Sequence, residues 1–270
     1  MPIDKINNHD MYYEVHGSGD PLICMGGWDT FCHGREKFLA RGLTDRYSVV
    51  IFDYRGIGDS NDDMSVAPSM ELHANDVIGL LDELGYSNVH FVGLVGMGAC
   101  VAQQVAIKRP DLVRSMLNMG AWASVDPFLA DQLKLFRNMH EHAGFFAFQE
   151  CVAVLSFLPD YYNANRDKLL GEGGVWWALH DRFQAHNRLV EACLSHDVQD
   201  QLHQIKAPSF IIHAGNDIVT SPRNTLPIEQ AIPGAKGYMW EEVGHVVAGK
   251  AEKIQYCDLL YGFLDEVEAA

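Results

Sequence analysis

Two polar residues in the last quarter of the sequence have the types and the placement of an acid–base pair. Asp217 follows the apolar run 210–214 in a Gly-Asn-Asp turn, and His245 follows the run 236–240 in a Glu-Val-Gly-His turn. Both turns would lie at the carboxyl edge of a parallel sheet, where open α/β folds bind ligands. A buried carboxylate that binds one imidazole nitrogen fixes the tautomer and leaves the other nitrogen free as base or acid. We therefore predict His245 and Asp217 as catalytic residues.

These two turns belong to a chain in which strands and helices alternate. Apolar runs bounded by glycine or polar turns predict strands over residues 11–15, 21–25, 47–52, 89–93, 116–119, 209–214 and 236–240. Helical spacing of apolar residues predicts helices over residues 71–84, over 99–108 and from about 251 to the end. The alternation predicts an α/β fold with a mostly parallel, twisted sheet and helices on both faces.

The pattern changes in the middle of the chain. Between about residues 127 and 205 the apolar residues have helical spacing, aromatic residues are frequent, and no run is typical of a strand. We expect a helical cap insertion over residues 125–205. The α/β core would then consist of residues 1–124 and 206–270.

Five short segments resemble those of the α/β-hydrolase superfamily and occur in the same order. They read MGGW at 25–28, DYRGIGDS at 53–60, VGLVGMGACVA at 92–102, GNDIV at 215–219 and EVGH at 242–245. The resemblance covers nearly the whole chain and implies the α/β-hydrolase fold. The helical insertion is loosely similar to the caps of enol-lactone hydrolases and of aminoacrylate-type hydrolases.

The superfamily carries its nucleophile in the signature Gly-x-Ser-x-Gly, on a sharp strand-to-helix turn. Residues 93–98 read GLVGMG here and contain no serine. Counting from the strand places Val95 at the apex, whereas counting back from the helix places Gly96 there. The apex has positive φ, which would cost a β-branched residue on the order of a few kcal/mol and a glycine nothing. We therefore place Gly96 at the apex, with Val95 beside it, and leave a plain glycine-rich turn as the alternative.

The resemblance also implies which groups form the oxyanion hole and the substrate pocket around this apex. Backbone N–H groups of Gly27 and Met97 would form an oxyanion hole, and Trp28 and Val95 would line the substrate pocket. Neither candidate for the apex can attack a carbonyl group, so a covalent serine intermediate is excluded. The missing side chain leaves space that a water molecule can fill if polar groups line it.

Other reactive side chains are assigned structural roles. Cys24 and Cys100 lie in apolar surroundings and are expected to be buried thiols rather than nucleophiles. Arg55 is expected to hold the turn after residues 47–52, with binding of a substrate carboxylate as the lesser option. The histidines besides His245 have no metal-ligand spacing, and His140 and His196 are expected at the surface or in the cap. We predict no metal and no cofactor.

Length and composition fit a single large α/β domain with an insertion. The chain has 270 residues, of which 48% are hydrophobic and 21% charged. Its formal net charge of -16 argues against binding of nucleic acid or of an anionic membrane surface. No apolar stretch is long enough to span a membrane, and no signal peptide is recognised. We expect a cytoplasmic monomer or homodimer whose partner is a small-molecule substrate.

Three functions fit these observations. The first is a cofactor-independent enzyme that uses His245 and Asp217 as general acid and base on a small carbonyl substrate, in water-mediated hydrolysis, decarboxylation or another lyase or cyclisation step. The second is an ordinary ester, lactone or C–C hydrolase, with a cysteine nucleophile or with a serine engineered to Gly96. The third is a non-catalytic ligand-binding pseudoenzyme.

Overall fold

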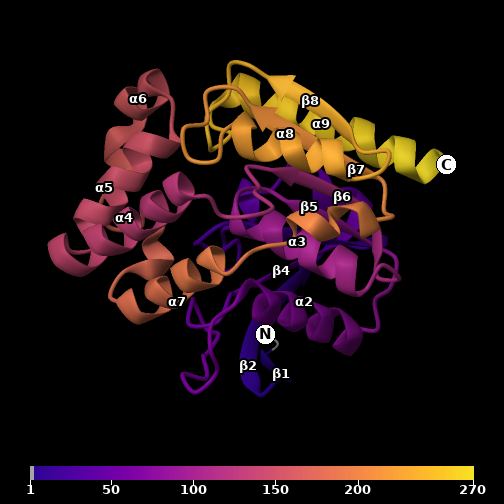
Figure 1. Cartoon of the computed structure of the whole chain (residues 1–270), viewed down its shortest axis with the longest axis horizontal. Helices are drawn as coiled ribbons and strands as arrows, with labels where there is room; N and C mark the ends of the chain where they lie inside the picture. The colour runs from indigo at the N-terminus through magenta and orange to yellow at the C-terminus, as the bar shows by residue number, and fades with distance from the viewer. Residues whose placement is uncertain (1–2) are drawn as a thin grey trace.

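The apolar runs of the sequence form one eight-stranded sheet in the computed structural model, which describes residues 3–270 (Figure 1). The strand order is β1-β2-β4-β3-β5-β6-β7-β8, and all pairs are parallel except those that β2 makes with β1 and β4. The predicted α/β architecture is confirmed. The strands are β1 (Ile3–Ile6), β2 (His9–His16), β3 (Asp20–Met25), β4 (Tyr47–Phe52), β5 (Val89–Gly93), β6 (Val113–Met119), β7 (Ser209–Ala214) and β8 (Lys236–Trp240).

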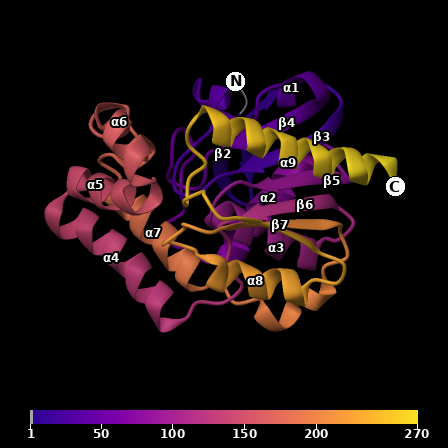
Figure 2. The ribbon, with the colours of Figure 1, turned by 90° about the horizontal axis from the view of Figure 1, so that it is seen from above.

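Helices cover both faces of the sheet because neighbouring side chains of a strand point in opposite directions. In β3, Leu22 and Cys24 belong to one core and Ile23 and Met25 to the other. The first core is closed by α1 and α9, and the second by α2, α3 and α8 (Figure 2). The helices are α1 (Leu43–Arg46), α2 (Met70–Glu83), α3 (Met97–Lys108), α4 (Pro127–Ala143), α5 (Phe145–Ser156), α6 (Pro159–Leu169), α7 (Phe183–Leu194), α8 (Pro222–Ala231) and α9 (Lys250–Ala269). Short 3₁₀-helices span Glu36–Phe38, Trp177–Leu179 and Gln199–Gln204.

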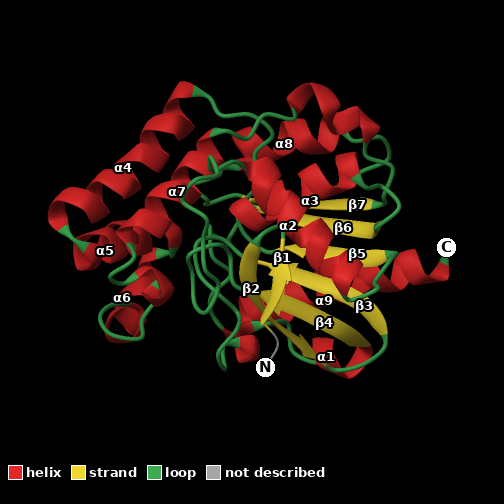
Figure 3. Ribbon diagram, turned by 90° about the horizontal axis from the view of Figure 1, so that it is seen from below, coloured by secondary structure: helices red, strands yellow, loops and turns green. Residues whose placement is uncertain are grey.

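Helices α4 to α7 follow one another between β6 and β7 and lie together beside one end of the sheet (Figures 1 and 3). The first of them begins at Pro127, and the carboxylate of Asp126 accepts the N–H of Leu129 at 2.8 Å as its N-cap. Side chains from three of these helices, among them His140, Phe148 and His186, pack against one another. We continue to treat residues 125–205 as the proposed cap.

The strand order reverses at β3. This strand has β4 on one side and β5 on the other, so the loops that follow β3 and β5 diverge at their carboxyl ends. Such a switch point is where open α/β sheets bind ligands. The loop after β3 contains Gly27, and the loop after β5 contains Gly96. The sheet topology therefore brings these two glycine-containing loops together under the cap.

Some elements of the fold go beyond the sequence-based expectation. Strand β1 and helices α1 and α8 are present although no pattern predicted them. In the part of the chain that the structure describes, no helix is long and apolar enough to cross a membrane.

Candidate active site

Gly96 forms the apex of the turn between β5 and α3. Its backbone has φ 57° and ψ −114°, and α3 begins at the next residue, Met97. Val95 is not among the described residues with positive φ. An L side chain is strained at such angles, whereas glycine adopts them freely. Of the two sequence registers, the structure therefore has the one with Gly96 at the apex and Val95 as an additional residue before it.

The three glycines of this turn have different surroundings. A Cβ on Gly98 would lie 2.4 Å from the carbonyl oxygen of Met25, and one on Gly93 would lie 2.5 Å from Cα of Ala99. At Gly96 the nearest atom would be the Cζ3 ring carbon of Trp122, at 3.7 Å, which is ordinary van der Waals contact. Gly93 and Gly98 are therefore required for close packing, while Gly96 leaves room for a side chain that the sequence does not provide.

Asp217 and His245 lie side by side at the carboxyl ends of β7 and β8. Oδ2 of Asp217 lies 2.9 Å from Nδ1 of His245, and the carboxylate has no exposed surface. Oγ1 of Thr220 donates to the same carboxylate oxygen at 3.0 Å and lies 3.1 Å from Nδ1 of His245. With Nδ1 committed to this contact, Nε2 of His245 is the ring nitrogen left to act on a ligand.

Several groups keep Asp217 ionised despite its burial. Burial alone would raise the pKa of this carboxyl group. The nearby imidazole of His245 and two backbone N–H groups, from Val219 at 2.7 Å and Thr220 at 2.8 Å, outweigh that effect, so the pKa of Asp217 lies below its ordinary value. A carboxylate that remains charged can hold the ring of His245 in one orientation and one tautomer.

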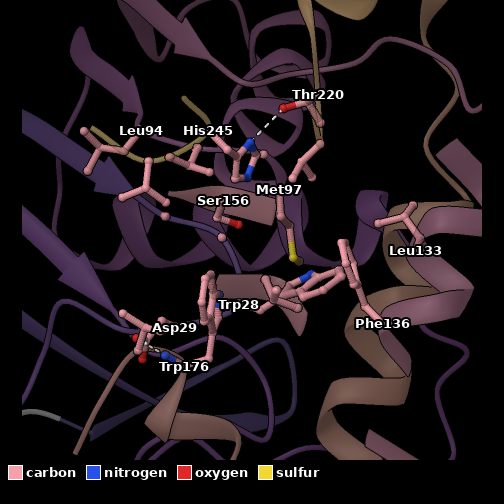
Figure 4. A pocket seen from close by; sticks show the side chains of 18 of the residues that line it. Trp28, Asp29, Leu94, Met97, Leu133, Phe136, Ser156, Trp176, Thr220 and His245 are labelled. Carbon is pink, nitrogen blue, oxygen red and sulfur yellow. Dashed lines mark hydrogen bonds between the residues drawn. The ribbon is translucent and has the colours of Figure 1, made fainter. Parts of the chain in front are cut away.

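A cavity of about 220 Å³ lies between the edge of the sheet and the cap (Figure 4). His245 and Thr220 line it from the core and Ser156 lines it from α5, while Trp28 and Phe136 are among its many apolar walls. No lysine or arginine belongs to the lining that the described residues provide. The cavity is smaller than the ~300–1,000 Å³ of common ligand pockets, so it suits a small and mainly apolar molecule.

The predicted residues fall into two groups around this cavity. Those that line it are Gly27, Trp28, Val95, Gly96, Met97 and His245. Asp217 lies behind His245 and does not line it. The N–H of Met97 is in the first turn of α3, where helical amides have no partner within the helix and the helix dipole favours negative charge. The other predicted oxyanion donor, Gly27, lies against the same turn, since its Cβ would be 3.8 Å from the carbonyl oxygen of Val95.

Asp29 connects the core to the cap at the rim of the cavity. Its carboxylate accepts a hydrogen bond from Arg35 at 2.8 Å and from the backbone N–H of Trp176, in the cap, at 3.0 Å. Burial raises the pKa of this carboxyl group, and the charge of Arg35 opposes the effect. The contacts hold the Trp176 loop against the residues that follow β3.

The structure places three other polar residues. Of the two places expected for His196, the surface is wrong: the residue lies within the 125–205 segment, it is 1% exposed, and its Nε2 lies 3.2 Å from Oε1 of Gln103. Arg55 binds the carboxylate of Asp76 at 2.6 and 2.8 Å and does not line the cavity, so the option that it holds a substrate carboxylate is wrong. His140 lies in α4 and is buried, with its Nδ1 3.0 Å from Nδ1 of His186.

The two cysteines considered as nucleophiles, Cys24 and Cys100, are buried. Cys100 donates to the carbonyl oxygen of Trp122 at 3.4 Å, and burial raises the pKa of its thiol. Burial likewise raises the pKa of the Cys24 thiol. No cysteine is part of the described cavity lining, so none is placed to attack a ligand there.

One group of potential metal ligands lies elsewhere. One ligand atom each from Glu14, His16 and Glu36 lies within 4.8 Å of the others, on partly exposed side chains. Glu14 and His16 already bind each other at 2.7 Å. None of the three lines the cavity, so they do not contribute to its chemistry.

Three polar residues of the site were not predicted, namely Asp29, Ser156 and Thr220. Thr220 could have been found, because it follows Asp217 by three residues in the same turn. Asp29 directly follows the predicted MGGW segment. Nothing in the helical pattern of residues 145–156 distinguishes Ser156 from its neighbours, because its place in the site depends on how the cap sits on the core.

Comparison of the sequence with known proteins identifies the family to which the chain belongs. Residues 15–254 match the alpha/beta hydrolase family. The protein named "Putative carbamate hydrolase RutD" of Azorhizobium caulinodans is 26% identical over 272 residues, covering 99% of this chain and 100% of that protein. Its namesake in Stutzerimonas stutzeri is 26% identical over 242 residues, covering 87% of this chain and 89% of that protein.

Solved structures share the fold. The alpha/beta hydrolase MGS-M2, from a Medee basin deep-sea metagenome library, aligns with a TM-score of 0.85 at 20% identity, covering 98% of this chain and 97% of that one. The enol-lactonase from Burkholderia xenovorans aligns with a TM-score of 0.83 at 19% identity, covering 98% of this chain and 100% of that one. At these identities the likeness concerns the fold alone.

Proposed function

This chain is an enzyme of the alpha/beta hydrolase family, and from that premise we propose that it hydrolyses a small, uncharged carbonyl compound without a covalent intermediate. His245 would act as the general base, oriented by Asp217, and no cofactor would take part. One observation carries the proposal: His245, paired with Asp217 at 2.9 Å, lines the same cavity as Gly96, which has no side chain.

Water takes the place of the missing nucleophile in this mechanism. Nε2 of His245 removes a proton from a water molecule, and the resulting hydroxide adds to the carbonyl carbon. The N–H groups of Met97 and Gly27 stabilise the negative charge that forms on the carbonyl oxygen. When the intermediate collapses, the C–O or C–N bond to the leaving group breaks and His245 returns the proton to that group. The enzyme is then unchanged, and no bond to the protein has formed.

The space at the apex supports the role of water. The position that a Cβ of Gly96 would occupy has no neighbour closer than 3.7 Å apart from the adjoining backbone. A water molecule requires two to four polar partners. His245 and the Met97 amide, which line the same small cavity, would supply two such partners.

The lining of the cavity favours an uncharged substrate. A substrate carboxylate would enter an apolar cavity without a described lysine or arginine to bind it, next to the buried charge of Asp217. Decarboxylation of a carboxylate substrate is therefore less supported than hydrolysis of an ester, lactone or carbamate. The name of the carbamate hydrolase among the similar proteins agrees with this class of substrate.

The two alternative functions have less support. A cysteine nucleophile would require a thiolate in the cavity, yet Cys100 and Cys24 are buried away from the described lining and the pKa of each thiol is raised. A non-catalytic receptor would not need an imidazole held by an ionised carboxylate at the cavity wall.

Replacing the imidazole tests the proposal. His245→Ala should lower kcat/KM by about a thousandfold, the usual size of a general-base contribution, toward whichever neutral ester, enol-lactone or carbamate the wild-type enzyme hydrolyses fastest. The matched control is His142→Ala, on the exposed side of α4, where the side chain is 72% exposed; this variant should retain full activity. Unchanged turnover in His245→Ala would refute the general-base role.

A further inference from the structure

Ser156 is a buried hydroxyl group without a partner in the protein. Its residue is 1% exposed, yet its Oγ forms no hydrogen bond with any described residue. A serine in a helix can donate to the carbonyl group four residues earlier, which here would be that of Val152, but Ser156 does not. A buried hydroxyl group left unpaired is unfavourable, whereas an alanine at the same place would be free of that cost. The hydroxyl group is therefore available to a ligand.

The backbone fixes Ser156 beside the proposed catalytic base. Its carbonyl oxygen accepts the N–H of Val246, the residue after His245, at 3.1 Å. The same oxygen would lie 3.3 Å from a Cβ on Gly244, so the absence of a side chain there permits the close approach. Ser156 is the last residue of α5, and this contact joins the end of a cap helix to the loop that carries His245. Figure 4 shows Ser156, His245 and Met97 among the residues that line the pocket.

The other hydroxyl and carboxyl groups of the cavity lining already have partners. Thr220 binds Asp217, and Asp29 binds Arg35. The Nε1 atom of Trp122 is also unpaired, but it is the benzene ring of this indole that faces the apex, through Cζ3. Among the hydroxyl and carboxyl groups of the described lining, which belong to Asp29, Ser156 and Thr220, that of Ser156 is the one without a partner in the protein.

We propose that Ser156 determines substrate specificity by binding a second, uncharged oxygen atom of the substrate, adjacent to the carbonyl group that is attacked. The substrate class would be carbonyl compounds with a hydroxyl or carbonyl oxygen on the neighbouring carbon. This inference rests on the proposed function, because it assumes that the first carbonyl oxygen binds at the Met97 amide. Because Ser156 ends α5, this hydrogen bond would come from the side of the proposed cap.

A matched pair of ketones that cannot be hydrolysed provides the test. Acetophenone and 2-hydroxyacetophenone differ by one hydroxyl group next to the carbonyl and are both neutral and mainly apolar. Isothermal titration calorimetry on the full chain should show about tenfold tighter binding of 2-hydroxyacetophenone, as expected for one additional hydrogen bond in a buried site. Ser156→Ala should remove this preference while leaving the Kd of acetophenone within about twofold, and Ser156→Thr should restore part of it.

The control is Ser209→Ala, which removes a buried hydroxyl group that binds the carbonyl oxygen of Ala207, outside the cavity. This variant should keep the wild-type preference. The inference is overturned if Ser156→Ala retains the preference, if the wild-type protein binds both ketones equally, or if it binds neither. Because no bond of either ketone is hydrolysed, these outcomes are independent of whether His245→Ala loses activity.

Discussion

Oδ2 of Asp217 lies 2.9 Å from Nδ1 of His245, whose ring lines the cavity. Gly96, at the apex of the turn between β5 and α3, lines the same cavity and has no side chain that can exchange a proton with this imidazole. In a site with a serine, the imidazole would activate the hydroxyl group; here the same orientation can serve only a molecule that enters the cavity. The relationship between these two residues therefore leads to predictions for each group that supports the imidazole.

Asp217→Asn should lower kcat/KM by about a thousandfold or more with little change in KM. The amide keeps the shape of the carboxylate, but it is uncharged and permits the wrong imidazole tautomer. Steady-state kinetics at pH 7 measure the effect, and Asp131→Asn, on an 83% exposed side chain of α4, is the control. Activity within a few-fold of wild type would mean that His245 does not depend on the carboxylate.

Thr220→Val should lower kcat/KM by about five- to tenfold, corresponding to the loss of a hydrogen bond worth about 1 kcal/mol. Valine keeps the backbone N–H that binds Asp217 at 2.8 Å but removes the hydroxyl group that donates at 3.0 Å. Thr220→Ser keeps the hydroxyl group and should recover most of the activity. If valine and serine have the same effect, the role of the residue is packing rather than hydrogen bonding.

Gly96→Ser should create a covalent site at some cost in stability. The side chain has room, since the nearest ring carbon is 3.7 Å from the Cβ position, but φ 57° and ψ −114° should lower the free energy of unfolding by about 1–3 kcal/mol. A phosphonate probe should then label the introduced serine. As a contrast, Gly98→Ala should be more destabilising, because its Cβ would lie 2.4 Å from the carbonyl oxygen of Met25. Urea denaturation of both variants measures this order, and the reverse order would contradict the assigned apex.

Buried neutral histidines should make the protein sensitive to acid. Burial, followed by the charge of His140, lowers the pKa of His186 from 6.5 to about 3. The unfolded chain therefore binds the proton first, and the stabilisation is complete above pH 6.5 and decreases by about 1.4 kcal/mol per pH unit as the pH falls from there toward 3. His186→Gln should reduce the pH dependence of the free energy of unfolding between pH 7 and 5. His142→Gln, at an exposed position, should not change it, and equal slopes for wild type and His186→Gln would contradict the prediction.

The core of the fold was predictable because its signals are local. Strand β5 has the predicted bounds, and Gly96 could be chosen over Val95 because positive φ penalises a β-branched residue. The pairing of Asp217 with His245 followed from their positions after two strands, because parallel strands end at one edge.

Features that depend on the packing of separate segments were not predictable. Ser156 enters the site through a contact with Val246, 90 residues later in the chain. The sequence left His196 at the surface or in the cap, yet the residues after α7 return to the core and its ring packs against Trp122. Neither contact leaves a periodic pattern in the sequence.

Intact-protein mass spectrometry during turnover tests the central claim most directly, namely that this site hydrolyses its substrate without a covalent intermediate. The wild-type enzyme would be acid-quenched in the steady state with the neutral ester that it hydrolyses fastest, and Gly96→Ser treated in the same way would serve as the covalent control. We predict an unmodified mass for the wild-type protein and a mass increased by the acyl group for the variant. A wild-type protein carrying the acyl group, on a cysteine, on Ser156 or on any other side chain, would contradict the account.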